Sequence, residues 1–403
     1  MASGSNEYEV MIRSVETVVP MVQLQKHRLP LSNFDLLVPT VVHHYFCFQK
    51  PTLTTVTEDA SAGFTTFPTM VAALKVALSK VLVMYYPLAG EVVTNSVGEQ
   101  EILCNNRGVD LIEAYADVEL TELNLYNPDD SVEAKLLPKN TEDPLHSDAY
   151  SFFMFMTAWA NIVLNKPINQ MPSFCRFLLS SQNISSSNSS DPIYDQFFTP
   201  LSLQSPPNPK ISSETRVNHI YYISAVDIAR LQELCGHSHS KLVCFIAYFW
   251  KILARSASRA KSLIDMTLTE VAEEVNKWLS AATKEDHFLG LVEWLEAHRL
   301  KPIVPTVFLG KEEDKSISCV VSSGRSFPEI NFGWGNATFS SCHFPVREKG
   351  GYLFTIPQFN TGDWVVYAQL APRIVAAMEK EPTIFRPLRS LDVYKSRSSR
   401  ARL

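Results

Sequence analysis

The sequence lacks the motifs of several large enzyme classes. It contains no glycine-rich phosphate loop and no Gly-x-Ser-x-Gly elbow, so neither a P-loop nucleoside triphosphatase nor a serine hydrolase of that type is expected. Its seven cysteines form no Cys-x-x-Cys pair, and this odd number predicts free thiols in a reducing compartment, the cytoplasm. No apolar run approaches the ~18 residues of a membrane span. Residues 1–10 also lack the apolar core of a signal peptide, so no membrane partner is expected.

Charge is also sparse, at 19% of residues, and the net charge of -6 argues against nucleic acid as a partner, because nucleic-acid binding needs clustered Lys and Arg. A hydrophobic fraction of 46% in 403 residues instead predicts a globular protein with room for two domains. The pairs His43-His44 and His237-Ser238-His239 have no further ligands at metal-binding spacing, so no metal site is predicted. Nothing in the sequence requires more than a monomer.

Periodicity and end signals predict both helices and strands. A helix begins at Pro68, and its apolar stripe includes Val71, Leu78 and Val81 at helical spacing. A capping pattern at Ser224 and a further one at Thr267 start two more helices. The predicted helices are 149–163, 224–236, 242–253, 267–279 and 285–298, besides the one at Pro68. The predicted strands are 10–19, 46–48, 101–105, 220–223, 317–321, 337–339, 351–356 and 364–370.

A serine-rich stretch, Ser185–Ser190, and a proline cluster, Pro206–Pro209, interrupt this pattern. Such composition cannot bury a core, and it is typical of a surface connection. We therefore predict an N-terminal domain at residues 1–180, a crossover linker at 181–216, and a C-terminal domain at 217–403.

The most distinctive segment is Asn331-Phe332-Gly333-Trp334-Gly335, because the whole chain holds only 6 Trp and 14 Gly. Glycine serves where the backbone needs positive φ, and tryptophan covers a large flat surface. On local evidence the segment is a tight turn between two strands. Asn331 is then expected to cap the turn, which makes the loop structural rather than catalytic.

This pentapeptide resembles the Asp-Phe-Gly-Trp-Gly signature of the plant BAHD acyltransferases, with Asn331 in place of the aspartate. Three further segments resemble the family in the same order along the chain. Leu31–Asp35 is similar to its Leu-Ser-x-x-Asp element, and Tyr86–Gly90 to its Tyr-Pro-Leu-Ala-Gly. Asp148–Ser151, running into Trp159-Ala160, is similar to the second half of its catalytic-helix signature. Within the family, the sequences of these segments are most similar to those of the coniferyl alcohol acyltransferase-like members.

The resemblance implies an α/β fold of two chloramphenicol acetyltransferase-like domains. Each would be a mixed sheet with flanking helices, and an active-site channel would lie at the domain interface. It also implies transfer of an acyl group from acyl-CoA, acetyl-CoA or a similar donor, to a plant alcohol such as coniferyl alcohol. Acyl-CoA would be a co-substrate, and no permanently bound cofactor is implied. A histidine would act as general base, because an alcohol is a poor nucleophile at neutral pH.

In the family that histidine belongs to a His-x-x-x-Asp motif, which is altered here. Asp148 aligns with the aspartate, but Pro144 stands four residues before it, and the nearest histidine is His146. By resemblance, one internal segment is missing before His146. Another is missing near Ala260-Lys261, where the family has the arginine that pairs with its aspartate.

His146 is therefore the candidate base, displaced from the family's position, and the alternative is a surface-loop histidine without a role. Asp148 is by resemblance a structural residue at the active site, and the alternative is the N-cap of the following helix. The competing hypothesis for the whole chain is a non-catalytic protein that keeps the fold and acts by binding.

Overall fold

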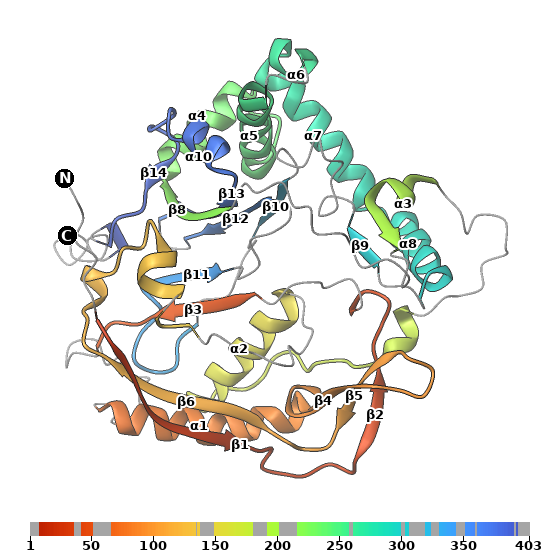
Figure 1. Cartoon of the computed structure of the whole chain (residues 1–403), viewed down its shortest axis with the longest axis vertical. Coiled ribbons are helices and arrows are strands. Elements are labelled where there is room, and N and C mark those ends of the chain that lie inside the picture. The colour runs from red at the N-terminus through yellow and green to blue at the C-terminus, as the bar shows by residue number, and fades with distance from the viewer. Residues whose placement is uncertain are drawn as a thin grey trace.

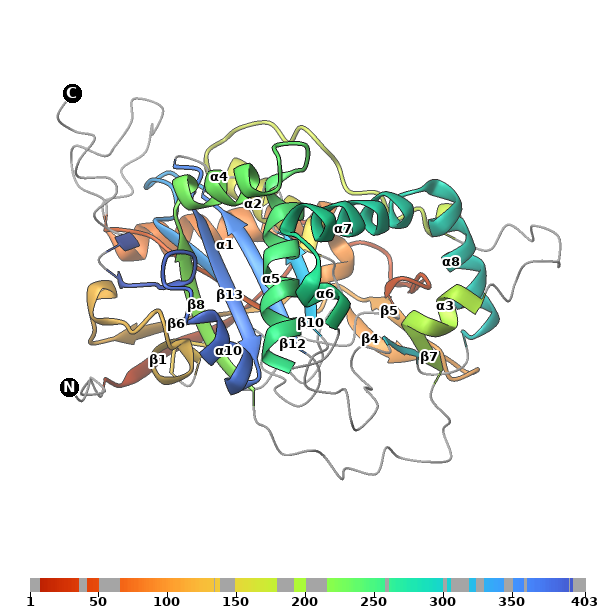
Figure 2. The same cartoon turned by 90° about the horizontal axis from the view of Figure 1, so that it is seen from above.

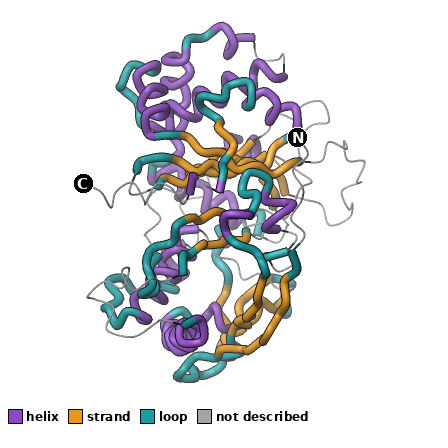
Figure 3. Tube along the Cα trace, turned by 90° about the vertical axis from the view of Figure 1, so that its left-hand side faces the viewer, coloured by secondary structure: helices purple, strands orange, loops and turns teal. Residues whose placement is uncertain are grey.

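The structure is a computed structural model of the chain. It describes residues 8–35, 42–50, 66–133, 135–137, 149–179, 192–200, 216–257, 261–299, 303–305, 319–323, 330–343, 351–358, 361–390 and 392–393. Helices gather above a central layer of strands, and a second group of strands and helices lies below it (Figure 1, Figure 3).

A five-stranded sheet forms the centre of the upper part, in the order β10-β12-β13-β8-β14. β10 runs parallel to β12, and the other pairs are antiparallel, so the sheet is mixed. All seven residues of its middle strand β13 are buried, as expected of an apolar strand with both faces covered. The strands are β8 (Val217–Ile223), β10 (Cys319–Ser323), β12 (Gly351–Pro357), β13 (Trp364–Leu370) and β14 (Arg386–Pro387).

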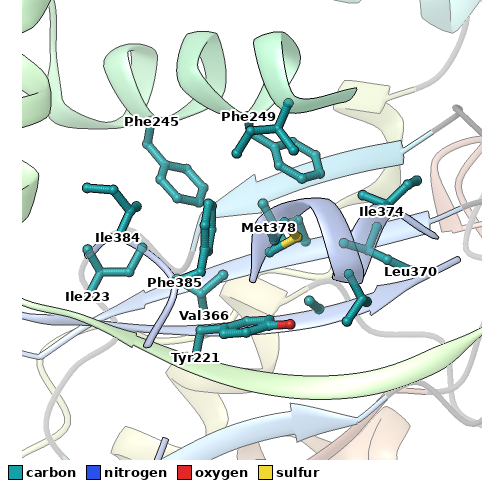
Figure 4. Packing of buried hydrophobic residues seen from close by; sticks show 14 of the residues in the cluster. Tyr221, Ile223, Phe245, Phe249, Val366, Leu370, Ile374, Met378, Ile384 and Phe385 are labelled. Carbon is teal, nitrogen blue, oxygen red and sulfur yellow. The ribbon is translucent and has the colours of Figure 1, made fainter. Parts of the chain in front are cut away.

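One face of this sheet is covered by α4 (Ala225–Leu234), α5 (Lys241–Ala257) and α10 (Pro372–Met378) (Figure 2). Side chains alternate along a strand, so Tyr221 and Ile223 of β8 point to these helices while Ile220 points to the opposite face. The helices contribute large aromatic and aliphatic side chains to the resulting core, among them Phe245 and Phe249 of α5 and Met378 of α10 (Figure 4).

The opposite face of the sheet is covered by a two-stranded ribbon and by a segment from the N-terminal half of the chain. β3 (His43–Cys47) pairs antiparallel with β11 (Phe339–His343), and this two-stranded ribbon lies beneath the sheet (Figure 1). Leu123, Leu125 and Val132, from the segment that follows β6 (Val109–Ala116), complete the cluster on this face. That segment contains the short helices η3 (Leu120–Glu122) and η4 (Asp129–Glu133). Both faces of the sheet are therefore buried.

The lower part contains α1 (Phe67–Met84) packed against α2 (Ala149–Val163). α1 begins where the sequence indicates, because Thr66 and Thr69 form a capping box and Pro68 lies in the first turn. The ribbon of β1 (Val10–Val18) and β6 (Val109–Ala116) lies beside it. A small sheet of β2 (His27–Pro30), β5 (Gln100–Cys104) and β4 (Glu91–Thr94) completes this part, with the short helix η2 (Tyr86–Ala89) before β4.

Among the described helices, α1 is the one whose length and composition would allow it to cross a membrane. A core helix passes the same test. Leu78, Val81 and Leu82 of α1 are buried in one cluster with Ala158 of α2 and Val18 of β1, so no membrane contact is inferred from it.

An arm extends from the C-terminal part of the molecule. Val271, Ala272 and Val275 root α7 (Leu268–Ala282) against α5, and α8 (Glu285–Ala297) follows at its far end (Figure 1). α8 packs against α3 (Pro192–Phe197) and a short strand pair, β7 (Phe198–Pro200) with β9 (Ile303–Pro305). Residues 192–200 of the predicted linker therefore contain a helix and a strand. The predicted domain boundaries themselves stay a prediction.

The root of the arm includes a buried lysine. Nζ of Lys251, in α5, donates to the carbonyl oxygens of Leu263, Ile264 and Met266, and the residue is 8% exposed. These carbonyls lie at the C-terminal end of α6 (Lys261–Asp265), where the last carbonyls of a helix have no intrahelical partner. The lysine thus caps α6 and joins it to α5.

The long predicted elements are confirmed, and most differences concern short or polar strands. β13 matches its predicted range, and β8, β12, α2, α4, α5, α7 and α8 agree within a few residues at their ends. Three predicted strands are displaced: 46–48 overlaps only the end of β3 at 43–47, 337–339 touches only the start of β11, and 317–321 overlaps β10. Strands β2, β4, β6, β7, β9 and β14 were not predicted, because most are short and carry polar or proline residues.

Candidate active site at the seam between the lobes

We name three parts of the molecule. The N-terminal lobe contains α1, α2, β1, β2 and β4–β6; the C-terminal lobe contains the five-stranded sheet with α4–α7 and α10; the seam is the β3–β11 ribbon between α2 and that sheet. The predicted base His146 and its neighbour Asp148 lie outside the described residues, which resume at Ala149 with the first residue of α2. Their roles stay predictions, while the helix predicted after them is confirmed.

The first turns of α2 contact β3. The Phe152 ring stacks on His44, with centroids 4.5 Å apart and an interplanar angle of 21°. Phe153 approaches the edges of His44 and Phe46. The start of α2 is therefore held against the seam by aromatic packing.

His44 is neutral at physiological pH. Burial, and to a smaller extent the neighbouring His43, lower the pKa of its imidazole to about 4, because an apolar environment and a nearby like charge both disfavour the imidazolium. Such a ring is a weak base. It serves better as a flat surface or as a neutral hydrogen-bonding group than as an acceptor of the substrate proton.

The other side of the ribbon faces the five-stranded sheet and is unusually polar for a buried layer. His43 and His343 face each other across the ribbon with centroids 6.5 Å apart, and the His343 ring meets Tyr367 of β13 edge-on at 5.9 Å. Burial raises the pKa of Tyr45, which lies beside Ser341. Among the described residues, no group of three or more His, Cys, Asp or Glu side chains could hold a metal ion.

The ribbon's thiols are poor candidates for nucleophiles. Burial raises the pKa of Cys47 to about 12 and raises that of Cys342 as well. The thiolate is the nucleophilic form of cysteine, and it is scarce at neutral pH at both positions. We infer that these cysteines act as small apolar side chains in the packing.

The tail loop Asn331–Gly335 is a turn that leads into β11. Oδ1 of Asn331 accepts a hydrogen bond from the backbone N–H of Gly333 at 2.8 Å, as expected of a turn cap. Gly333 and Gly335 both have φ of 106°, a conformation that side chains with a Cβ rarely adopt. Asn331 also forms an isolated antiparallel bridge with Asn336, which closes the turn.

The two aromatic rings of this loop pack into the N-terminal lobe. Phe332 is 4% exposed, and its ring stacks with Trp334 at 5.6 Å and meets Trp159 of α2 at 5.3 Å. Phe48, which follows β3, contacts both Phe332 and Trp334. The loop therefore holds α2 and the end of β3 together. The contacts described for it are packing contacts and the hydrogen bonds of the turn itself.

The residues that line the seam were not predicted from the sequence. His44 and Phe152 meet because β3 and α2 pack together. His343 lies opposite His43 because β11 pairs with β3. The available signal was the density of rings along residues 43–48, where five of six side chains carry one. In the structure the odd positions face the sheet and the even positions face α2.

Comparison with known proteins places this geometry in context. The sequence model of the Transferase family matches residues 8–146 and 252–384. Among solved structures, vinorine synthase superimposes with a TM-score of 0.64 over 94% of this chain and 99% of that one, at 15% identity. TRI101 of F. graminearum, solved with coenzyme A and deoxynivalenol, gives 0.63 over 88% and 97%, at 10% identity. These similarities confirm the predicted fold class of two chloramphenicol acetyltransferase-like domains.

Curated relatives match over shorter stretches. Putrescine hydroxycinnamoyltransferase 1 of Oryza sativa subsp. japonica is 37% identical over 118 residues, 28% of this chain and 24% of the relative. Rosmarinate synthase of Plectranthus scutellarioides is 27% identical over 208 residues, 43% of this chain and 44% of the relative. The chain thus aligns with less than half the length of each of these relatives.

Proposed function

The chain belongs to the Transferase family, that of the plant BAHD acyltransferases, and on this premise we propose that it transfers an acyl group from an acyl-CoA thioester to the hydroxyl of a plant alcohol. The family match, which runs through both lobes in order, is the observation that carries the proposal. The seam is the proposed site, because elements from both ends of the chain meet there. A cytoplasmic location and a monomeric state belong to the same proposal and rest on the sequence alone.

The proposed donors are of two kinds. The resemblance in sequence favours acetyl-CoA or a similar small acyl-CoA, with coniferyl alcohol as acceptor. The names of the relatives favour a hydroxycinnamoyl donor, since they include a putrescine and a shikimate hydroxycinnamoyltransferase. TRI101, which shares the fold, was crystallised with coenzyme A, and this supports acyl-CoA as the co-substrate in either case.

In the proposed reaction, His146 accepts the hydroxyl proton of the alcohol while its oxygen attacks the thioester carbonyl carbon. The tetrahedral oxyanion collapses, the carbon–sulfur bond breaks, and the coenzyme A thiolate takes up the proton as it leaves. The lowered pKa of His44 disqualifies it as the main base at neutral pH. His146 is therefore the proposed base.

A non-catalytic binding protein is the second candidate, and the spacing of His146 and Asp148 favours it. His146 stands two residues before Asp148, where the family's histidine stands four residues before its aspartate, so the two residues are differently spaced from those of the family motif. A misplacement of about one ångström can reduce a rate about a hundredfold. The two candidates differ in turnover and agree in binding.

The decisive experiment offers the purified protein acetyl-CoA or p-coumaroyl-CoA with coniferyl alcohol and follows thiol release with a disulfide reagent. Cys175 is the exposed thiol of the protein itself, so a reaction without acceptor supplies the baseline. We expect release that His146→Ala abolishes and that His237→Asn, in the α4–α5 turn, leaves unchanged. Binding of acyl-CoA by calorimetry without release above the His146→Ala level would instead establish the binding protein.

A further inference from the structure

The Leu31–Asp35 segment has no part in the proposed chemistry, yet its conformation is fixed by its own side chains. Oδ2 of Asp35 accepts hydrogen bonds from the backbone N–H and the hydroxyl of Ser32, both at 2.7 Å. The Ser32 hydroxyl oxygen in turn accepts from the N–H of Asp35 at 3.2 Å. Leu31, Ser32 and Asn33 are all at most 6% exposed. The segment is therefore a closed, buried turn of the N-terminal lobe.

This turn contacts the C-terminal end of α8. Nδ2 of Asn33 donates to Oε2 of Glu296 at 2.8 Å and to the carbonyl oxygen of Val292 at 3.4 Å. Phe34 packs against the cluster that contains Tyr194 and Trp294. A motif recognised near the start of the chain thus binds a helix that is 259 to 263 residues away in sequence.

Arg299, two residues beyond α8, joins this contact to a third segment. Its Nε donates to Oε1 of Glu99 at 2.7 Å, one terminal nitrogen to Oδ1 of Asn33 at 2.5 Å, and the other to the carbonyl oxygen of Leu31 at 3.1 Å. The guanidinium therefore uses every one of its nitrogens, in the planar fork geometry that lysine lacks. Its side chain is 20% exposed, and that of Glu99 is 24% exposed.

Glu99 lies in a turn that is closed by hydrogen bonds of its own. It closes the β4–β5 turn, in which Oδ1 of Asn95 accepts from the N–H groups of Val97 and Glu99 at 3.0 and 2.9 Å. Gly98 supplies the positive φ of 90° that the turn requires. Because the turn is closed by its own bonds, little freedom is lost when Arg299 binds.

The position of α8 makes this contact a link between lobes. α7 is rooted in the C-terminal lobe through Val271 and Val275, and its second half, from Asn276 to Ala282, is exposed on the way to α8 (Figure 1, Figure 2). The α7–α8 arm thus starts on one lobe and ends on the other, beside the seam rather than within it.

We propose that Arg299, with the Leu31–Asp35 turn and Glu99, is a positioning latch that fixes the arm to the N-terminal lobe and so sets the separation of the lobes at the seam. The part that concerns acyl-CoA rests on the proposed function. A fixed separation favours a ligand that contacts both lobes, because the lobes need not be ordered when it binds. Opening the latch then weakens acyl-CoA binding and has little effect on the chemical step.

Hydrogen exchange followed by mass spectrometry tests the latch without need of turnover. In Arg299→Ala we expect protection in residues 285–297 and 31–35 to fall about tenfold or more, since a charge-assisted hydrogen bond is worth about one factor of ten. Protection in β13 should not change. Arg299→Lys keeps the charge and loses the planar fork, so its loss of protection should lie between those of the wild type and Arg299→Ala. The double variant Arg299→Ala/Glu99→Gln should lose little more protection than Arg299→Ala alone, because both changes remove the same Arg299–Glu99 contact.

The matched control is Arg107→Ala, which removes an ion pair with Glu91 on the same small sheet, 3.0 Å long and more exposed, and should leave exchange in α8 unchanged. Uniform loss of protection throughout Arg299→Ala, or none in α8, would overturn the latch. In the assay of transfer, Arg299→Lys should raise KM for acyl-CoA several-fold with kcat within about twofold. If the wild type shows no turnover, the proposed function fails, and the exchange experiment together with the Kd for acyl-CoA still decides the latch.

Discussion

Replacing Phe332 by alanine should weaken the packing that holds α2 to the seam. The Phe332 ring is 4% exposed and lies between Trp334, Trp159 and Phe48. Its removal leaves a cavity walled by three rigid rings, and such a site relaxes little. The loop backbone is further constrained by the Asn331–Gly333 hydrogen bond. Collapse around the cavity is therefore expected to be incomplete.

The magnitude follows from these contacts. A buried Phe→Ala substitution costs about 3–5 kcal/mol, with the upper part of the range where the site cannot collapse. For a chain of 403 residues that unfolds as one unit, an unfolding entropy of about 2 cal/mol/K per residue converts about 4 kcal/mol into a fall in Tm of about 5 °C. If the N-terminal lobe unfolds by itself, the fall is larger, because the unfolding unit is smaller.

The measurement is thermal and urea unfolding, followed by near-ultraviolet circular dichroism, which reports the packing of the Trp159 and Trp334 rings. Phe67→Ala serves as the control, because Phe67 is 52% exposed and its truncation should cost less than about 1 kcal/mol. A Phe332→Ala protein within 1 kcal/mol of the wild type would refute the idea that this loop fastens α2 to the seam.

Three further predictions concern single side chains. Lys251→Met should lower the free energy of unfolding by about 2–4 kcal/mol, because it leaves three carbonyls at the end of α6 without their donor; urea unfolding beside the exposed Lys277→Met measures this. Asn331→Asp should keep stability within about 0.5 kcal/mol of the wild type at pH 7, while Asn331→Ala loses about 1 kcal/mol, because only the acceptor oxygen bonds Gly333. His44 binds its proton with a pKa of about 4 when folded and 6.5 unfolded, so the unfolded state takes up more protons between these values. Stability is then lost as pH falls from about 6.5 to 4, by about 3 kcal/mol at most, and His44→Phe should show a smaller loss over that range.

The sequence predicted the parts of the fold whose cause is local. The apolar run 364–370 predicted a strand buried on both faces, and the capping pattern at Thr267 and Glu270 predicted the start of α7. α1 was found from Pro68 and its apolar stripe. In each case the residues that decide the structure are neighbours in the chain, so a short window contains the full signal.

Elements whose stability comes from a distant partner were harder to predict. β3 carries His43 and His44, which are poor strand formers by local measures, and it is a strand because β11 pairs with it. The tail loop was predicted as a turn capped by Asn331, and the turn has that cap. Its function as an anchor for α2 depends on Trp159 in the other lobe, and a local pattern contains no information about that neighbour.

The β3–β11 ribbon also constrains how the molecule is made. During synthesis the N-terminal half leaves the ribosome at about 5–20 residues per second. Within the part of the chain that the structure describes, β3 pairs with β11 alone, so it lacks this partner until the chain has grown by nearly 300 residues to reach Thr338, which bonds the carbonyl of Cys47 across 291 positions. Through that interval α2 also lacks the ring of Phe332. A nascent chain of this kind exposes an unpaired strand edge and an aromatic surface, which are the features that chaperones bind. Truncation before the last quarter of the sequence should therefore yield an aggregating fragment rather than a smaller folded lobe.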